Sequence, residues 1–296
     1  MGQTGYRVQL LAPAHAGALT PHVSTQEDAG LHNHYLCSLQ RLRGQAYLED
    51  GAIEPWELDG SGRFRMEGDE ESWHFLLVNE DERVIACLRL LLHANTISFD
   101  QLRLTHSYLA KDPVWSGKLR ASVEADLAEA RRQNIGYAEL GGWAIDADYR
   151  CTKAALQTLV ASYAWGQMVG HCLSSCTATI RHRSAMILRR LGGKSLTING
   201  EIIPTYNDPH YGCQMEILRF DSREIDSRFV NLVEETREQL EASIVIRPCA
   251  TPFDELQEQL SMNRSLLALG EATRRNTRPV RQGDFIAAPE RTRAVS

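Results

Sequence analysis

A polar turn with two basic residues separates a strand-like segment from an apolar, helix-like segment. The strand pattern covers residues 137–145, the turn is DADYRCTK over residues 146–153, and the helix pattern covers residues 153–168. A helix N-terminus presents unpaired backbone N–H groups and a positive dipole end, so it favours anions. Arg150 and Lys153 add positive charge there. The turn predicts a site for a phosphate-bearing ligand; the alternative is an ordinary helix start with solvated basic side chains.

Periodicity predicts the elements that must position this turn. Apolar residues at intervals of three and four indicate helices, and β-rich runs bounded by polar turns indicate strands. Helices are expected over residues 29–48, 115–133, 153–168, 183–191, 227–240 and 253–269, the fifth of them rich in Glu. Strands are expected over residues 73–78, 83–92, 137–145, 171–179, 202–206 and 214–220. The glycine-rich, acidic stretch 50–72 is expected to be a loop, and residues 98–110 fit no single pattern.

Four parts are expected along the chain. Residues 1–28 show no clear periodicity and are expected to be irregular. Residues 29–221 hold the alternating elements of one domain, and residues 222–270 form a helical extension. Residues 271–296 have six Arg against three acids and few large apolar side chains, which predicts a basic flexible tail.

The composition narrows the class of protein. The chain has 296 residues and a net charge of -6, so we expect no nucleic-acid partner. No apolar run is long enough for a transmembrane segment, and the N-terminus does not resemble a signal peptide. The seven cysteines are scattered without a C-x-x-C pair, which favours reduced thiols in a cytoplasmic protein. His32 and His34 lack supporting ligands, so no metal is expected.

The unit from Tyr137 to Leu196 resembles the acyl-donor core of the GNAT acyltransferases. That superfamily binds the donor pyrophosphate at a turn with Arg or Gln, two residues, Gly, one residue, and Gly or Ala. Arg150, Lys153 and Ala155 occupy these positions here, so the central Gly is missing. The run RHRSAMILRRLG over residues 181–192 resembles the family's last helix, but Leu188 stands where a Tyr often protonates the leaving thiolate.

The first half resembles the acyl-homoserine-lactone synthases and related N-acyl amino acid synthases. The likeness lies in LRGQAYL at residues 42–48, DEESWHFL at residues 69–76 and VIACLRL at residues 84–90. Glu139 falls where that branch carries a Glu beside the acyl donor, although Leu140-Gly141-Gly142 replaces the branch's Ser-Arg. The resemblance implies a GNAT-like α+β (three-layer α/β) fold, with a mixed, mostly antiparallel twisted sheet flanked by helices and a C-terminal helical extension.

The resemblance also implies the chemistry. The donor would be an acyl-ACP, which carries 4'-phosphopantetheine, or an acyl-CoA, and the acceptor a small-molecule amine such as an amino acid. Glu139 is the expected general base, acting directly or through water, and Arg43 and Arg89 are expected to bind the acceptor carboxylate. The expected donor-binding residues are Trp143, Ala144, Ile145, Arg150, Cys151, Thr152, Lys153, Ala154 and Ala155. A backbone N–H from residues 141–144 would polarise the thioester carbonyl.

Each of these roles has a structural alternative. Glu139 fits a salt-bridged strand residue equally well, and Arg43 and Arg89 fit structural ion pairs with the acidic loop. Trp73, Phe75, Trp143 and Trp165 fit an acyl channel or ordinary core packing, and packing is the commoner use of such residues. Two other functions stay open: a non-catalytic binding module, and a small-molecule N-acetyltransferase using acetyl-CoA.

Overall fold

The computed structural model describes residues 5–13, 23–94 and 96–248, without the side chain of His182. A helix expected over residues 253–269 and the tail expected over residues 271–296 lie outside the described residues. In the described part, the helices are α1 (Ala29–Glu49), α2 (Ser116–Gln133), α3 (Ala154–Met168), α4 (Ser184–Leu191) and α5 (Val230–Ala242). Short 3-10 turns lie between them, at Pro55–Glu57, Phe99–Gln101, Arg103–His106, Leu109–Lys111, Ala147–Tyr149, Arg181–Arg183 and Ser227–Phe229.

One ten-stranded sheet forms the centre of the fold, with strand order β10-β11-β6-β5-β4-β3-β1-β12-β2 and β7 beside β11. Most neighbours are antiparallel, but β5 runs parallel to β6, and β12 runs parallel to both β1 and β2. The strands are β1 (Tyr6–Leu11), β2 (Ser24–Glu27), β3 (Trp73–Asn79), β4 (Val84–His93), β5 (Gly136–Ile145), β6 (Cys172–Thr179), β7 (Lys194–Ser195), β10 (Tyr206–Asp208), β11 (Cys213–Asp221) and β12 (Ile244–Arg247). A separate hairpin pairs β8 (Thr197–Ile198) with β9 (Glu201–Ile202).

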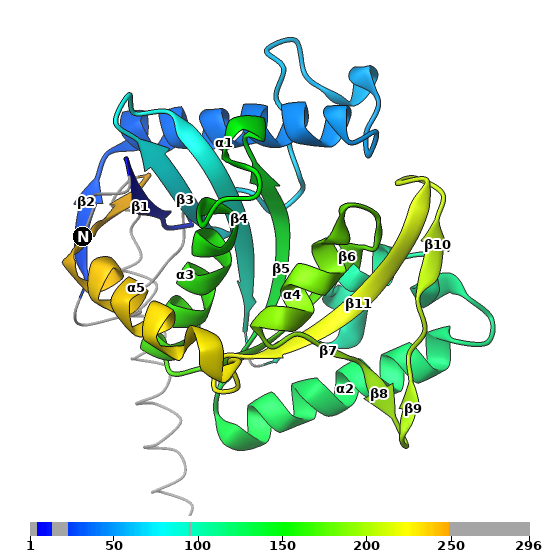
Figure 1. Ribbon diagram of the computed structural model, residues 1–296. Coiled ribbons are helices and arrows are strands. Elements are labelled where there is room, and N and C mark those ends of the chain that lie inside the picture. Colours follow the sequence, from blue (N-terminus) through cyan, green and yellow to red (C-terminus); the bar gives the residue numbers. More distant parts are fainter. Residues whose placement is uncertain (1–4, 14–22, 95, 249–296) are drawn as a thin grey trace, which may run out of the picture. The chain divides into compact units, whose positions relative to one another are not determined.

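Helices cover both faces of this sheet (Figure 1). The apolar core on one face joins α3, α4 and α5 to Leu88 and Leu90 of β4. On the opposite face α1 packs over Cys87 of β4, and α2 packs over Tyr137 of β5 and Leu173 of β6. Side chains alternate between the two faces along a strand, which explains why Leu88 and Cys87 belong to different cores. The expected three-layer α+β fold with a mixed, mostly antiparallel sheet is confirmed.

Two expected chain boundaries were wrong. Residues 1–28 are not irregular throughout, because Tyr6–Leu11 pairs with β3 along its whole length and Ser24–Glu27 pairs with β12. Residues 222–248 are not an appended extension, since α5 packs on α3 and β12 inserts between β1 and β2. The strand expected over residues 202–206 is also wrong: β9 ends at Ile202 and β10 begins at Tyr206. All three errors concern short segments whose structure depends on partners distant in the sequence.

The parallel strands β5 and β6 part in the middle of the sheet. Their pairing runs from Gly136↔Cys172 to Leu140↔Cys176 and then stops, although both strands continue. Beyond that point β5 follows β4, and the register between them shifts between Cys87 and Arg89. A bulge of this kind bends the strand that holds the extra residue. The fold therefore opens between two neighbouring strands, close to residues 141–143 (Figure 1).

Candidate active site

A cavity of about 510 Å³ lies where β5 and β6 separate. Its walls come from both faces of the sheet. The α3 and α4 face contributes apolar side chains, among them Leu88, Leu159 and Leu188, whereas the α1 and α2 face contributes Arg89 and Glu139. The cavity therefore has one apolar wall and one polar wall.

The polar wall rests on a buried ion cluster. Arg43 of α1 is fully buried and makes a two-pronged pair with Asp69, with Nη1–Oδ1 at 3.1 Å and Nη2–Oδ2 at 2.5 Å. Gln40 and the backbone N–H of Met66 also donate to Asp69. Burial alone would raise the pKa of Asp69, but the charge and hydrogen bonds of Arg43 outweigh it and lower that pKa to about 2. Arg43 therefore holds the acidic loop against α1, and it does not line the cavity.

The buried guanidinium of Arg89, on β4, has fewer hydrogen-bonding and ionic partners than that of Arg43. Its Nη1 donates to the Glu67 carbonyl at 2.8 Å and lies 3.4 Å from Asp69, which Arg43 already holds. Its buried Nε has no acceptor within the described chain, and the side chain lines the cavity with only 5% exposure. Burial and the nearby charges of Arg43 and Arg103 lower the pKa of Arg89, although Asp69 opposes them. A buried guanidinium with an unpaired N–H group beside a cavity favours an anionic ligand.

Glu139 of β5 is a buried carboxylate on the same wall. It accepts from His93 Nε2 at 2.9 Å and from the backbone N–H groups of Arg103 and Leu104 at 3.0 and 2.8 Å. Burial would raise its pKa, but the His93 contact and the two backbone donors lower it. Glu139 therefore stays ionised near neutral pH. It also fixes the 3-10 turn Arg103–His106 at the edge of the cavity.

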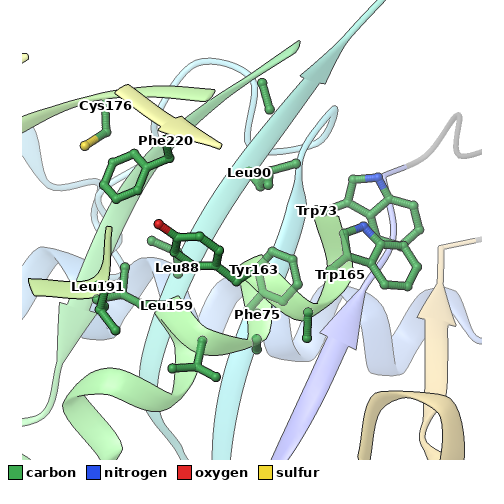
Figure 2. Packing of buried hydrophobic residues seen from close by; sticks show 14 of the residues in the cluster. Trp73, Phe75, Leu88, Leu90, Leu159, Tyr163, Trp165, Cys176, Leu191 and Phe220 are labelled. Carbon is green, nitrogen blue, oxygen red and sulfur yellow. The ribbon is translucent and has the colours of Figure 1, made fainter. Parts of the chain in front are cut away.

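The apolar wall is continuous with the core. Leu88, Leu159 and Cys176 belong to both, and behind them lie Tyr163 and Phe220 (Figure 2). The four aromatic residues considered for an acyl channel separate into two groups. Trp73, Phe75 and Trp165 are buried in the core, and Trp73 and Trp165 have ring centroids 4.5 Å apart. Trp143 alone of the four lines the cavity.

The predicted phosphate turn lies beside the cavity and contributes none of its lining. Arg150 is partly exposed and pairs with Glu49 at 3.1 Å and Asp50 at 3.9 Å, and Asp50 lines the cavity. Cys151 adopts φ +63°, and α3 begins at Ala154. Among the described residues, the backbone N–H groups of Cys151 and Lys153 donate no hydrogen bond. Those two groups are therefore available to an anion.

Three tyrosines complete the polar wall, and no motif in the sequence distinguishes them. Tyr47 comes from α1, Tyr206 from β10 and Tyr211 from the turn after it. Burial raises the pKa of all three, so they remain neutral hydrogen-bond donors at ordinary pH. Only the three-dimensional convergence of three separate elements could have identified them.

The structure therefore brings together part of the predicted site. Glu139, Arg89 and Trp143 line one cavity, whereas Ala144, Ile145 and residues 150–155 are not among its lining residues. Arg43 lies behind Arg89. Nothing in the geometry tests the roles themselves, which remain predictions. Within the described chain no group of three His, Cys, Asp or Glu side chains is placed to hold a metal ion, and no helix could cross a membrane.

Comparisons with known proteins agree with this architecture. No protein-family model matches the chain, and neither does any curated protein sequence. Among solved structures, the CoA-dependent acyl-homoserine lactone synthase BjaI, with SAM and isopentyl-CoA, is 13% identical over 82% of this chain and 93% of its own, with a TM-score of 0.50. FeeM, an N-acyl amino acid synthase from uncultured soil microbes, is 15% identical over 74% of this chain and 92% of its own, with a TM-score of 0.43. The likeness to BjaI shows that this chain shares the fold of that synthase.

Proposed function

We propose that this protein is an N-acyltransferase that moves an acyl group from a thioester to an amine. The observation that carries the proposal is the cavity between β5 and β6, which has an apolar wall on one face of the sheet and a polar wall on the other. A thioester with a fatty chain suits the first wall, and a small polar acceptor suits the second. The fold shared with BjaI is consistent with this chemistry.

The reaction forms a C–N bond and breaks a C–S bond. An amine on the polar side attacks the thioester carbonyl, its proton passes to Glu139 directly or through water, and the thiolate leaves. A backbone N–H of residues 141–144, where the register of β5 against β4 shifts, stabilises the oxyanion. Leu188 cannot donate a proton to the leaving thiolate.

The donor is an acyl carrier protein or CoA thioester, and we favour the carrier protein with a long acyl chain. Lys153 occupies the place of the glycine that admits a diphosphate, and Arg150 is already paired with Glu49. These features suit the single phosphate of 4'-phosphopantetheine better than the diphosphate of CoA. Ala144, Ile145 and residues 150–155 would line that arm. BjaI is described as CoA-dependent, so CoA thioesters remain the comparison donor.

The acceptor is proposed to be an amine such as an amino acid, whose carboxylate pairs with Arg89. Arg43 supports this role from behind by holding Asp69. The guanidinium of Arg89, whose Nε has no partner within the described chain, can form a charge-assisted contact with a carboxylate. The compartment proposed for the reaction is the cytoplasm, where such donors are made.

Mass spectrometry of lipid extracts tests the proposal. Cells that overproduce the protein should accumulate a new N-acyl species that is absent from cells producing the Glu139→Gln variant. The mass of that species would give both the acceptor and the chain length. Extracts without any new acylated amine, from cells with abundant folded protein, would argue against the function. Donor binding without acyl transfer would favour a non-catalytic binding module. An acetylated product would favour a small-molecule N-acetyltransferase.

A further inference from the structure

A second guanidinium stands beside Arg89. Arg103 lies within the unpatterned segment 98–110, and it lines the cavity from its 3-10 turn. Its Nη1 lies 3.2 Å from the Glu67 carboxylate, and that carboxylate is 77% exposed. An exposed partner is screened by water and stabilises the charge weakly. Arg103 is therefore a cation at the cavity edge without a buried counter-ion.

The local backbone is built to admit this side chain. A Cβ added at Gly68 would lie 2.7 Å from Arg103 Nη2, and Gly68 adopts φ +78°, which L side chains rarely adopt. Arg89 contacts the same turn through the Glu67 carbonyl. The two arginines thus converge on residues 67–68, close enough for the charge of Arg103 to depress the pKa of Arg89.

Glu139 fixes the position of Arg103. The carboxylate accepts the backbone N–H groups of Arg103 and Leu104, so the turn cannot move away from β5 without breaking two hydrogen bonds. The nearest buried carboxylate on the other side, Asp69, is held by Arg43. Two neighbouring cations therefore face the cavity while the available buried carboxylates are already occupied.

We propose that Arg103 and Arg89 together form an anion subsite on the polar wall, and that Arg103 determines specificity for acceptors that carry a carboxylate. This inference rests on the proposed function for its ligand, an N-acylated amino acid or its precursor. It assigns the choice between an anionic and a neutral acceptor to Arg103. Arg103 contacts the acceptor anion and takes no part in bond formation.

A matched pair of product-like probes tests the subsite without turnover. N-decanoylglycine and its methyl ester differ by one negative charge, and isothermal titration calorimetry gives both Kd values. A charge-assisted pair predicts that wild-type protein binds the acid about ten- to a hundredfold more tightly than the ester. Arg103→Gln should remove most of that preference while leaving the Kd of the ester unchanged, and Arg103→Lys should restore part of it.

Two further variants keep the test decisive. Arg120→Gln is the matched control, because Arg120 is an exposed arginine paired with Asp100 outside the cavity, and the preference for the acid should persist. Glu67→Gln should keep or increase the preference, since it frees Arg103. Equal binding of acid and ester by wild-type protein, no binding of the acid, or an unchanged preference in folded Arg103→Gln would overturn the proposal.

The two proposals can fail separately. If N-acyl products form but acid and ester bind alike, the acyltransferase stands and the anion subsite is wrong. If the acid is preferred through Arg103 but no thioester supports transfer, the subsite stands in a protein that is not an acyltransferase.

Discussion

Glu139 connects the chemistry to the architecture of the cavity. Its carboxylate has three hydrogen-bond donors, two of them backbone N–H groups of the 3-10 turn Arg103–His106 on the same polar wall. From the sequence, Glu139 was predicted to act as a general base, with a salt-bridged strand residue as the alternative. The geometry allows both, because the same oxygens that hold the turn also border the cavity.

Glu139→Gln should lower acyl transfer by about 10²–10⁴-fold, the range in which a general base contributes. The fold should survive, because the amide oxygen still accepts from one of the backbone groups. Single-turnover kinetics with the best donor gives the rate of the chemical step, and circular dichroism checks the fold. An unchanged single-turnover rate would remove Glu139 from the mechanism.

Asp69, unlike Glu139, has a structural role and no proposed chemical role. Asp69→Asn would leave Arg43 and Arg89 without their buried carboxylate, and breaking such a pair costs about 3–5 kcal/mol. Urea unfolding measures the loss. The matched control is Asp100→Asn, which breaks the exposed pair with Arg120 and should cost no more than about 1 kcal/mol. Similar losses in the two variants would show that the buried cluster contributes little.

At the scale of elements, the separation of β5 from β6 creates the cavity. Gly142 lies at the bulge with φ +62°, and a Cβ there would be 3.1 Å from Arg43 Nη1. Paired glycines at residues 141 and 142 allow neighbouring groups to come close to this strand. The side chains that come close to these glycines are the arginines of the ion cluster, since a Cβ at Gly141 would also face Arg89 Nη2.

Gly142→Ala should therefore destabilise the protein by about 1–3 kcal/mol, through backbone strain and displacement of Arg43. Gly117→Ala is the control: Gly117 lies in α2 with open space around it, and alanine there should stabilise by about 0.4–1 kcal/mol. Urea unfolding of both variants measures these changes in the free energy of unfolding. Equal stabilities of the two variants would mean that the bulge tolerates a side chain.

The elements that could be predicted from sequence are those with strong local patterns. The apolar α3 and the β3–β4 pair were recognisable because their apolar runs are bounded by polar turns. The segment at 98–111 was not, since its three 3-10 turns are held partly by a carboxylate 35 residues away in sequence. For the same reason Arg103 could not be foreseen as a site residue, while Glu139 and Arg89 could.

For the molecule as a whole, both ends of the described chain join one sheet. Leu11 of β1 pairs with Ile246 of β12, which the periodicity of either segment could not reveal. Short strands without strong alternation acquire their structure from partners in space, so the irregular start and the appended helix expected from sequence were both wrong. The central region, where neighbours in sequence are neighbours in space, was predicted well.

The stability of the whole molecule should decrease in acid. The pKa of Asp69 is lowered from its ordinary 3.8 to about 2, so its ionised form contributes stability that is present above about pH 4. That contribution, on the order of 2 kcal/mol, is lost as the pH falls from about 4 to about 2. Glu139 adds a change of the same sign. Urea unfolding between pH 7 and pH 2 measures it, and Asp69→Asn should show a smaller decrease; an equal decrease in that variant would contradict the assignment.

The most direct test of the account is acyl transfer by the purified protein. Decanoyl groups are presented on acyl carrier protein or on CoA, together with a mixture of amino acids, and N-decanoyl products are quantified by mass spectrometry. We expect an N-acyl amino acid as product, a higher kcat/KM with the carrier protein than with CoA, and little product from Glu139→Gln. A preference for CoA would reverse the donor assignment. Tight binding of either donor without any N-acyl product would contradict the proposal that this protein is an N-acyltransferase.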